Sequence, residues 1–291
     1  MPRSTKAKAG KSPAKKSKGS GSGGGIVPDR RMLDAILAMV QAEAEDMTPL
    51  AAAQDIAWEA WDTDDRRKRL ALARKALKIS PLCADAYVIL AEDAKTVEEG
   101  LALCRQGVEA GEKALGKHAF HEDVGDFWGI LETRPYMRAR HGLAMRLWET
   151  GAREEAVAHY GDMLRLNPGD NQGIRYLLLD CLLVLGRDDE AEKLLRRYRN
   201  DGAAAWMWSA ALACFRREGN SAKARKALQR AADGNVHVAG YLLGRKKLPR
   251  TLPAYISVGG EDEAIAYVAD SGAEAWAAAP GALEWVAKVL G

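Results

Sequence analysis

RPYMRARHGLAMRLWETGAREEAVAHYGDMLRLNPGDNQ, residues 134–172, is the stretch that decides the fold. Its small and large apolar residues have the spacing of a tetratricopeptide repeat, in which two antiparallel helices touch and a proline closes the unit. The residues with this spacing are Leu143, Ala144, Leu147, Gly151, Ala156, Tyr160 and Pro168. One such unit cannot bury its own apolar face, so neighbouring units must stack on it. The stretch therefore predicts an all-α, right-handed helical solenoid.

Two further copies of the pattern follow the first. Gly151, Gly186 and Gly219 recur at intervals of 35 and 33 residues, close to the 34 expected for this repeat. At this position a glycine ends the first helix of each pair, because the chain needs a left-handed residue there. We therefore predict three clear repeats over residues 132–247.

The flanking segments complete the predicted organisation. Residues 26–131 hold a helix that begins near Pro28 and two degenerate helix pairs, followed by an irregular insert from Gly116 to Leu131. With the three clear repeats, this gives about five helix pairs. Residues 248–291 carry helices at Glu261–Ala269 and Ala282–Leu290, which we interpret as a helical cap on the open end of the solenoid.

Composition excludes several classes of protein. The 291-residue chain is 47% hydrophobic and has no run of about 18 apolar residues, which argues against a membrane span. Its four cysteines are far apart without a C-x-x-C pair, so a disulfide framework or zinc ribbon is not expected. The N-terminus is basic but lacks the apolar core of a signal peptide. We therefore expect a cytoplasmic protein.

Residues 1–25 form a basic Lys/Ser/Gly tail with seven cations and no acid. Such a segment buries too little apolar surface to fold, so it is predicted to be disordered. Lys11, Lys15, Lys16 and Lys18 resemble the basic residues of linker-histone tails. A tail of this kind binds nucleic acid weakly and in a salt-dependent way, whereas the simpler interpretation is a solubilising segment.

A resemblance to a known family lies mainly in residues 130–291. Glu132-Thr133-Arg134-Pro135-Tyr136, the run Leu164 to Tyr176, Asn235-Val236-His237-Val238 and Pro280-Gly281-Ala282-Leu283 resemble the core of the suppression-of-tumorigenicity-seven family. The resemblance implies a tetratricopeptide-like fold without an established catalytic activity. Animal members of that family carry apolar membrane segments, which this chain lacks. We expect a soluble bacterial relative.

A tetratricopeptide solenoid binds ligands mainly on its concave face, which the first helices of the pairs form. The phase of the three clear repeats places aromatic residues, arginines and polar side chains on that face. These groove candidates are Arg138, His141, Trp148, Tyr176, Asp180, Trp206 and Arg216. Aromatic and arginine side chains dominate interface energies, so the pattern favours a protein or peptide ligand. The alternative is that the tryptophans pack between helices as core.

The turn after Pro168 allows two interpretations. Asp170 or Asn171 can cap the next helix by accepting its free N–H groups. Alternatively, Asn171, Gln172 and Arg175 face a ligand at the helix N-terminus.

No sequence motif indicates catalysis. The chain lacks phosphate-binding, nucleophile-elbow and Rossmann patterns, and His118 and His121 have no third histidine nearby to complete a metal site. An active site around His237, Tyr241 and Glu261 has little support. We expect no enzymatic activity, no cofactor and no metal. The function favoured by the sequence is a protein- or peptide-binding scaffold, and the alternative is a nucleic-acid-associated protein tethered by its tail.

Overall fold

The computed structural model describes residues 47–291, of which Thr48–Gly291 form one compact unit. The basic tail with Lys11, Lys15, Lys16 and Lys18, and the helix expected from Pro28, lie outside the described residues. Those predictions therefore stay predictions.

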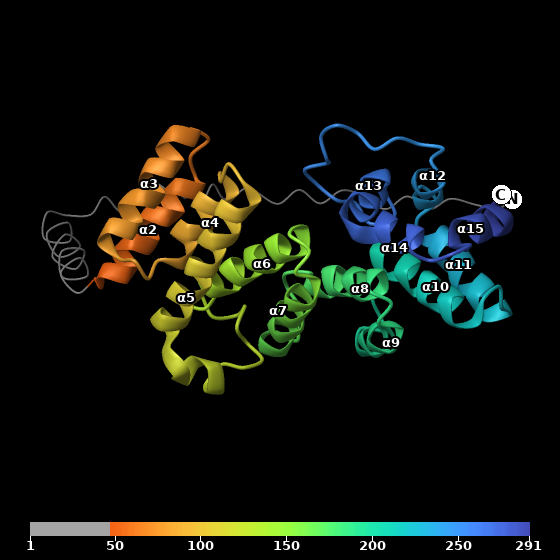
Figure 1. The fold of residues 1–291 in the computed structure, drawn as a ribbon, viewed down its shortest axis with the longest axis horizontal. Coiled ribbons are helices and arrows are strands. Elements are labelled where there is room, and N and C mark those ends of the chain that lie inside the picture. Colours follow the sequence, from red (N-terminus) through yellow and green to blue (C-terminus); the bar gives the residue numbers. More distant parts are fainter. Residues whose placement is uncertain (1–46) are drawn as a thin grey trace, which may run out of the picture. The chain divides into compact units, whose positions relative to one another are not determined.

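Five helix pairs follow one another along the unit (Figure 1). The pairs are α2 (Pro49–Trp61) with α3 (Arg66–Ile79), α4 (Ala84–Glu92) with α5 (Val97–Glu122), α6 (Arg134–Glu149) with α7 (Arg153–Leu166), α8 (Ile174–Val184) with α9 (Asp188–Arg197), and α10 (Ala204–Glu218) with α11 (Ala222–Gly234). Small residues such as Ala57, Ala144 and Ala211 are fully buried where the helices meet. The all-α fold and the helix-pair solenoid predicted from the sequence are confirmed.

Local signals in the sequence set where the helices begin. The hydroxyls of Thr48, Thr96 and Ser221 accept backbone N–H groups in the first turns of α2, α5 and α11, and the Asp65 carboxylate does so for α3. Such caps satisfy N–H groups that have no partner inside the helix, and each stabilises a helix by about 1 kcal/mol.

The repeating glycines have the predicted left-handed conformation. Gly151, Gly186 and Gly219 have φ values of 84°, 72° and 61°. A left-handed residue lets the chain reverse directly into the second helix of the pair, and a side chain at this conformation is strained.

Two glycine-to-alanine variants test the effect of backbone conformation at positions where the added side chain meets no other atom. A Cβ atom added at Gly151 or at Gly161, inside α7, meets nothing within 4 Å. We expect Gly151→Ala to lower the free energy of unfolding by about 1 kcal/mol, because alanine resists positive φ. Gly161→Ala should instead raise it by about 0.5–1 kcal/mol, because alanine favours the helix. Urea denaturation of both variants checks this, and equal effects would show that the turn conformation is not what matters.

The insert between the second and third pairs is more regular than predicted. Helix α5 continues to Glu122 through a kink at Gly116, where φ is 67°. Beyond the helix, the Phe127 side chain is fully buried against Phe120 and Tyr136. The backbone N–H groups of Gly125 and Phe127 donate to the carbonyl oxygen of Leu166. The insert therefore packs at the end of α7.

The C-terminal region also differs from the prediction. It contains α12 (Val238–Leu242), α13 (Glu261–Tyr267), a π-helical turn η1 (Val268–Gly272), α14 (Ala273–Ala277) and α15 (Ala282–Leu290). The helix expected at Glu261–Ala269 thus ends two residues early, whereas α15 matches its predicted bounds. Helix α13 contacts α10, and both η1 and α14 contact α8. The region therefore covers the first-helix face of the last two pairs as well as the end of the solenoid.

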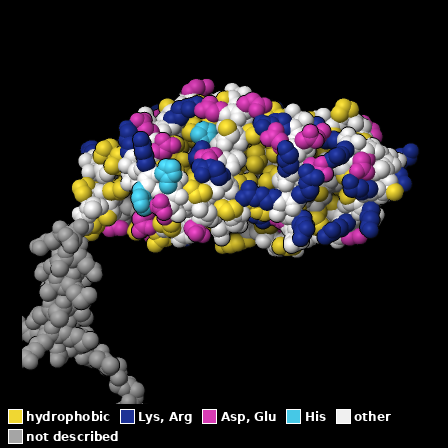
Figure 2. All heavy atoms as spheres, turned by 90° about the horizontal axis from the view of Figure 1, so that it is seen from below, with side chains coloured by type: hydrophobic (Ala, Val, Ile, Leu, Met, Phe, Trp, Pro, Cys, Tyr) yellow, Lys and Arg dark blue, Asp and Glu magenta, His cyan; other side chains and the backbone are white. Residues whose placement is uncertain are grey.

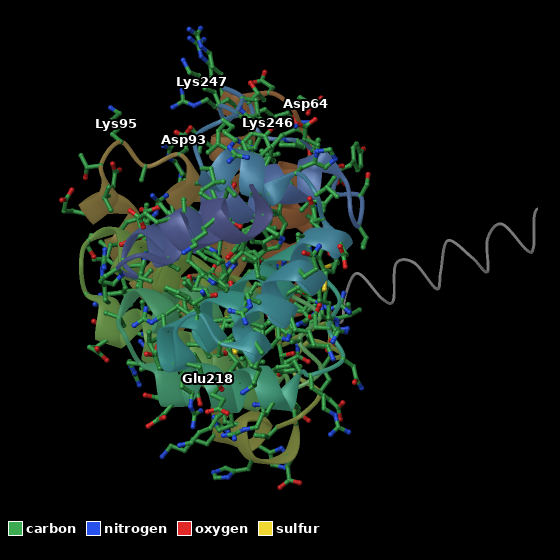
Figure 3. All side chains as sticks on the ribbon, turned by 90° about the vertical axis from the view of Figure 1, so that its right-hand side faces the viewer. Asp64, Asp93, Lys95, Glu218, Lys246 and Lys247 are labelled. Atoms are coloured by element: carbon green, nitrogen blue, oxygen red, sulfur yellow. The ribbon has the colours of Figure 1, made fainter. Side chains whose placement is uncertain are left out.

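A long connection without helix leads from α12 to α13. Lys246 in this segment forms an ion pair with Glu261 at 2.5 Å, and Tyr241 donates to the same carboxylate at 3.0 Å. Figure 3 shows Lys246 and Lys247 along the same edge, with Lys247 pointing outward. The pair fastens the connection to the start of α13.

Aromatic rings join the C-terminal helices to α10. The Trp276 ring lies 6.1 Å from that of Trp208 and 6.5 Å from that of Trp285, and Phe215 stacks on Trp285 at 4.5 Å. Trp208 and Trp276 are fully buried. This contact is part of the main core.

Candidate functional site

The first-helix face is divided into a covered half and an open half. Helices α8 and α10 contact the C-terminal region, and the predicted residue Asp180 lies in that contact. Ser209, which is fully buried, donates to Asp180 at 3.0 Å and lies 3.1 Å from the Tyr267 hydroxyl. The indole N–H of Trp276 donates to that same hydroxyl at 2.9 Å. The chain's own helices therefore fill this half of the predicted groove.

Burial shifts the titration of the covered groups. The pKa of Asp180 is raised to about 8, because the carboxyl group is removed from water and Asp270 lies near it. Burial likewise raises the pKa of Asp270, and Tyr267 has a strongly raised pKa for the same reason. The Asp180 carboxyl is consequently neutral at pH 7.

Two more groove candidates, Trp206 and Arg216, have partners within the chain. Trp206 is 3% exposed, and its ring lies edge-on between those of Tyr176 and Tyr198. Arg216 donates to the carbonyl oxygen of Leu183 at 2.5 Å and pairs with Asp188 at 3.0 Å, which connects α10 to the end of α8 and the start of α9. The prediction that Asp180 and Trp206 line an open groove is therefore wrong, because tertiary partners bury both side chains.

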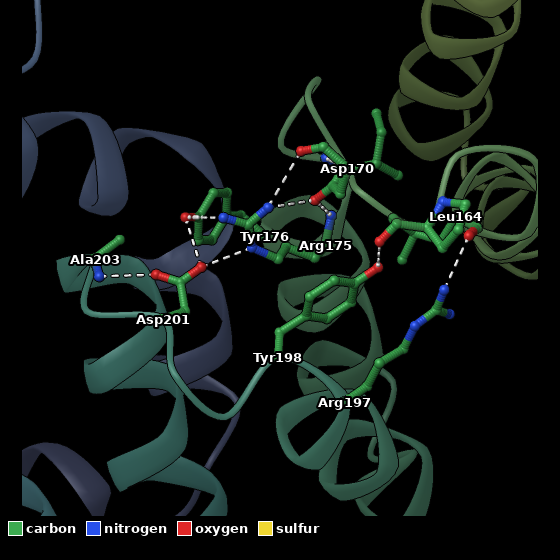
Figure 4. A network of polar contacts seen from close by, with 10 residues as sticks. Leu164, Asp170, Arg175, Tyr176, Arg197, Tyr198, Asp201 and Ala203 are labelled. Carbon is green, nitrogen blue, oxygen red and sulfur yellow. Dashed lines mark hydrogen bonds and ion pairs between the residues drawn. The ribbon is translucent and has the colours of Figure 1, made fainter. Parts of the chain in front are cut away.

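The turn after Pro168 supports the capping interpretation. Asp170 has a left-handed backbone with φ of 49°, and its carboxylate accepts the backbone N–H groups of Ile174 and Arg175. The Arg175 guanidinium pairs with Asp170 at 2.8 Å and Asp201 at 2.7 Å (Figure 4). Tyr176 donates to the same Asp201 carboxylate at 2.8 Å.

This network connects the start of α8 to the turn before α10, so Arg175 and Tyr176 hold two repeats together. Asn171 is exposed and Gln172 is half-buried beside them. No hydrogen bond within the described chain engages the Gln172 side-chain oxygen. The predicted residues are thus close together, but the side chains of Arg175 and Tyr176 already bind Asp201.

The open half of the first-helix face lies on α2, α4 and α6. A groove of about 520 Å³ is present there. Its apolar lining comes from Val88, Ala91, Cys104 and Met145, and Met145 is 44% exposed. We call this surface the first-helix groove.

An ion pair forms one wall of the first-helix groove. Arg138 donates to Asp85 through Nε at 2.8 Å and Nη2 at 2.5 Å, and Gln54 donates to the same carboxylate at 2.6 Å. The Arg138 guanidinium also lies over the Trp61 ring, 4.9 Å from its centroid. Arg138 therefore orders three helices and still presents part of its surface to the groove.

His141 is the polar group that lacks a partner in this groove. Its Nε2 atom is shielded from solvent and has no hydrogen-bond partner among residues 47–291. Burial lowers the pKa of the imidazole, so the ring is neutral at pH 7. A neutral imidazole nitrogen either donates or accepts a hydrogen bond, as a peptide group of a ligand requires.

Two charged side chains complete the groove. Burial raises the pKa of Glu92. Arg146 donates to the carbonyl oxygen of Ala91 at 3.0 Å and to Glu149 at 3.2 Å. With two acids, two arginines and a neutral histidine around apolar side chains, the groove has balanced charge, which matches a peptide better than a ligand of one charge sign.

Trp148 lies at the border between the open and covered halves. It is half-buried, and the Arg153 guanidinium lies over its ring, 4.6 Å from the centroid. Arg153 pairs in turn with Glu274 on α14 at 2.8 Å. The C-terminal region is thereby connected to the edge of the first-helix groove.

Trp61, Asp85 and Glu92 are among the residues in or beside the groove that were not predicted from the sequence. They lie on α2 and α4, whose repeats were recognised only as degenerate. The one signal that could have found them is position, because each lies on the first helix of its pair, as Arg138 does.

Neither a metal-ligand set nor a membrane-spanning helix occurs in the described part of the chain. Residues 47–291 contain no group of three His, Cys, Asp or Glu side chains arranged to hold a metal ion. His118 and His121 are exposed near the end of α5. Over the same residues, no helix has both the length and the apolar character needed to cross a bilayer.

Stacked helix pairs with left-handed glycine turns define the chain as a tetratricopeptide-like helical-repeat protein. Its family follows from the comparisons. The model of the ST7 protein family matches residues 42–289, so the chain belongs to that family, as the sequence resemblance implied.

Named relatives support this assignment. The suppressor of tumorigenicity 7 protein-like of Homo sapiens is 30% identical over 234 residues, which are 72% of this chain and 40% of that protein. The suppressor of tumorigenicity 7 protein of Macaca fascicularis is 29% identical over 268 residues, 81% of this chain and 49% of that protein. The chain thus spans less than half the length of these relatives.

One solved structure is also similar. It is the crystal structure of YrrB, described as a TPR protein with an unusual peptide-binding site. It matches with a TM-score of 0.46 and 19% sequence identity, over 67% of this chain and 91% of that chain.

Proposed function

We propose that the protein is a binding scaffold, without catalytic activity of its own, that holds a peptide segment of a protein partner in the first-helix groove on α2, α4 and α6. The observation that carries this proposal is the open groove of about 520 Å³, in which exposed Met145 lies beside half-buried Val88. A concave surface with exposed apolar side chains and a few polar groups around them favours a ligand that buries those side chains.

The covered half of the face strengthens the proposal. Elsewhere on the first-helix face, Tyr267 and Trp276 satisfy the polar side chains and cover the apolar ones. In the covered half, the Tyr267 hydroxyl binds buried Ser209 and apolar side chains pack around it. The open half has no such covering segment among residues 47–291, and we propose that a peptide takes that place.

The proposal is tested with peptides selected from a random library on the full chain. We expect Met145→Glu to weaken binding of the selected peptides by at least about tenfold, because it places a charge among the apolar contacts. Fluorescence anisotropy of labelled peptides measures the change. Leu252→Glu is the control, because Leu252 is 52% exposed on the connection before α13 and not among the groove residues. Peptides that bind both variants alike would place the binding site elsewhere.

A further inference from the structure

The stretch of chain from the end of α9 through α10 to α11 carries a concentrated positive charge. Residues 193–230 contain ten lysines and arginines but only two acids, Asp201 and Glu218. Figure 2 shows Lys and Arg side chains gathered on the right half of the face that it views. A surface so unbalanced attracts acidic partners and raises their rate of association.

A groove runs through this charged surface between α9 and α11. Its volume is about 420 Å³. Exposed cations lie on both sides, with Arg196 at the end of α9, Arg199 just beyond it, and Lys223, Lys226 and Arg230 on α11. Two acids, Glu192 and Asp201, also line the groove. The floor is apolar and half-buried, formed by Leu195, Met207, Ala210 and Ala227. We call this surface the basic groove.

Several cations of the basic groove have no counter-ion among the residues that the structure describes. Arg196 is 3.4 Å from Glu192, and Lys223 pairs with Glu218 at 2.7 Å. For Arg199, Lys226 and Arg230, no ion pair occurs within residues 47–291. These three side chains are therefore available to a negatively charged ligand.

The charge continues beyond the groove. Arg196, Arg199 and Asp201 also line a shallow depression of about 670 Å³ around Gly169 and Tyr198. Because the two hollows share these residues, a ligand that lies in the groove can extend over the end of α9.

We propose that the basic groove binds an acidic, amphipathic helical segment of a protein partner. Such a helix places its apolar side chains on the Leu195 and Met207 floor and its carboxylates beside Arg199, Lys226 and Arg230. This is the helix-in-groove mode of recognition, with charge complementarity along both sides.

The floor of the groove argues against nucleic acid as the ligand. Single-stranded nucleic acid binds through a basic surface together with exposed aromatic rings on which bases stack. Here Trp206 is almost fully buried, and the guanidinium groups of Arg175 and Arg197 lie over the Tyr198 ring. An apolar floor without a free aromatic ring suits leucine-like side chains instead.

The basic groove is independent of the first-helix groove, because it involves α9, the start of α10 and α11 rather than α2, α4 and α6. Met145→Glu should therefore leave it unchanged, and the two proposals can fail separately.

The experiment uses a fluorescein-labelled 18-residue peptide in which leucines recur at helical spacing among glutamates. A scrambled peptide of the same composition tests for amphipathicity, and single-stranded RNA of matched charge tests for general anion binding. Binding to the full chain is measured by anisotropy at two salt concentrations. Residues 1–25 are present in every protein compared, so differences between variants report on the groove.

We expect the amphipathic peptide to bind at least about fivefold more tightly than the scrambled one. Lys226→Glu with Arg230→Glu should weaken its binding by at least about tenfold. The matched control is Lys75→Glu with Lys78→Glu on α3, which makes the same charge change at exposed residues and should change binding less than about twofold. Equal binding of the two peptides, RNA binding lost in the same variant while the peptide is unaffected, or no binding at all would each overturn the proposal.

Discussion

Asp85→Ala is expected to lower the free energy of unfolding by about 3–5 kcal/mol, the usual cost of removing one partner of a buried ion pair. The Asp85 side chain is fully buried and accepts hydrogen bonds from both Arg138 and Gln54. Alanine leaves a guanidinium that is only 27% exposed without its counter-ion. It also leaves the Gln54 amide without its acceptor. Three helices, α2, α4 and α6, lose their shared polar contact.

The control for this prediction is Asp93→Ala, a few residues further along the chain. Asp93 accepts two hydrogen bonds from Arg66, but that arginine is 66% exposed and can turn to water. The Asp93 side chain itself is 17% exposed, whereas that of Asp85 is fully buried; Figure 3 labels Asp93. Exposed pairs contribute about 0–1 kcal/mol, so this variant should remain close to the parent in urea denaturation. Similar losses for both variants would show that burial of the Asp85 pair has no special importance.

The same ion pair bears on function. Arg138 forms a wall of the first-helix groove, and Asp85 fixes its position before any ligand arrives. A peptide that meets an already ordered arginine loses less side-chain entropy on binding than one that must order it.

Local patterns made the repeats predictable. Gly151, Gly186 and Gly219 mark the turns because few residues other than glycine accept a left-handed backbone, and Pro168 closes a helix because it cannot continue one. These rules act over a few residues, so a single sequence displays them directly. The order and the bounds of the central helices followed from such signals.

The covered groove was not predictable in the same way. Asp180 and Ser209 lie on the first-helix face. A polar residue on that face can contact either a ligand or another segment of the same chain. Their partner Tyr267 is about 60–90 residues further along the chain. Nothing in the helical spacing around Asp180 reports a contact over that distance. The Asp85–Arg138 pair was not predicted for the same reason, because its two residues are 53 apart in the sequence.

The polar cluster under the C-terminal region should make stability depend on pH. Asp180 has a folded pKa of about 8, while an unfolded aspartate titrates near 3.9. Between these values the unfolded chain is ionised and the folded chain holds a proton. Because the unfolded state then binds fewer protons, the free energy of unfolding decreases as pH rises from about 4 to 8. Asp270, whose pKa is also raised by burial, acts in the same direction.

Asp180→Asn should remove much of this dependence. Asparagine is uncharged, has nearly the same size and can still accept the Ser209 hydrogen bond. At pH 8 we expect the variant to be more stable than the parent by on the order of 1 kcal/mol or more, since a tenfold difference in proton affinity between the folded and unfolded chains corresponds to about 1.4 kcal/mol. At pH 5 the difference should be smaller than at pH 8, because pH 5 is only about one unit above the unfolded pKa near 3.9, so less of the linked stability has been lost.

Urea denaturation at pH 5 and pH 8 checks the Asp180 prediction, with Asp64→Asn as the control. Asp64 is exposed in the turn between α2 and α3, so its variant should follow the parent at both values. If Asp180→Asn were less stable than the parent at pH 8, the carboxylate would have to be ionised and stabilising in the folded protein. The contact of α8 and α10 with Tyr267 would then depend on a charge. If the variant instead gains stability as expected, neutral hydrogen bonds and apolar packing stabilise that contact. Raising the pH then weakens the packing of the C-terminal region on the first-helix face, because ionising Asp180 opposes it.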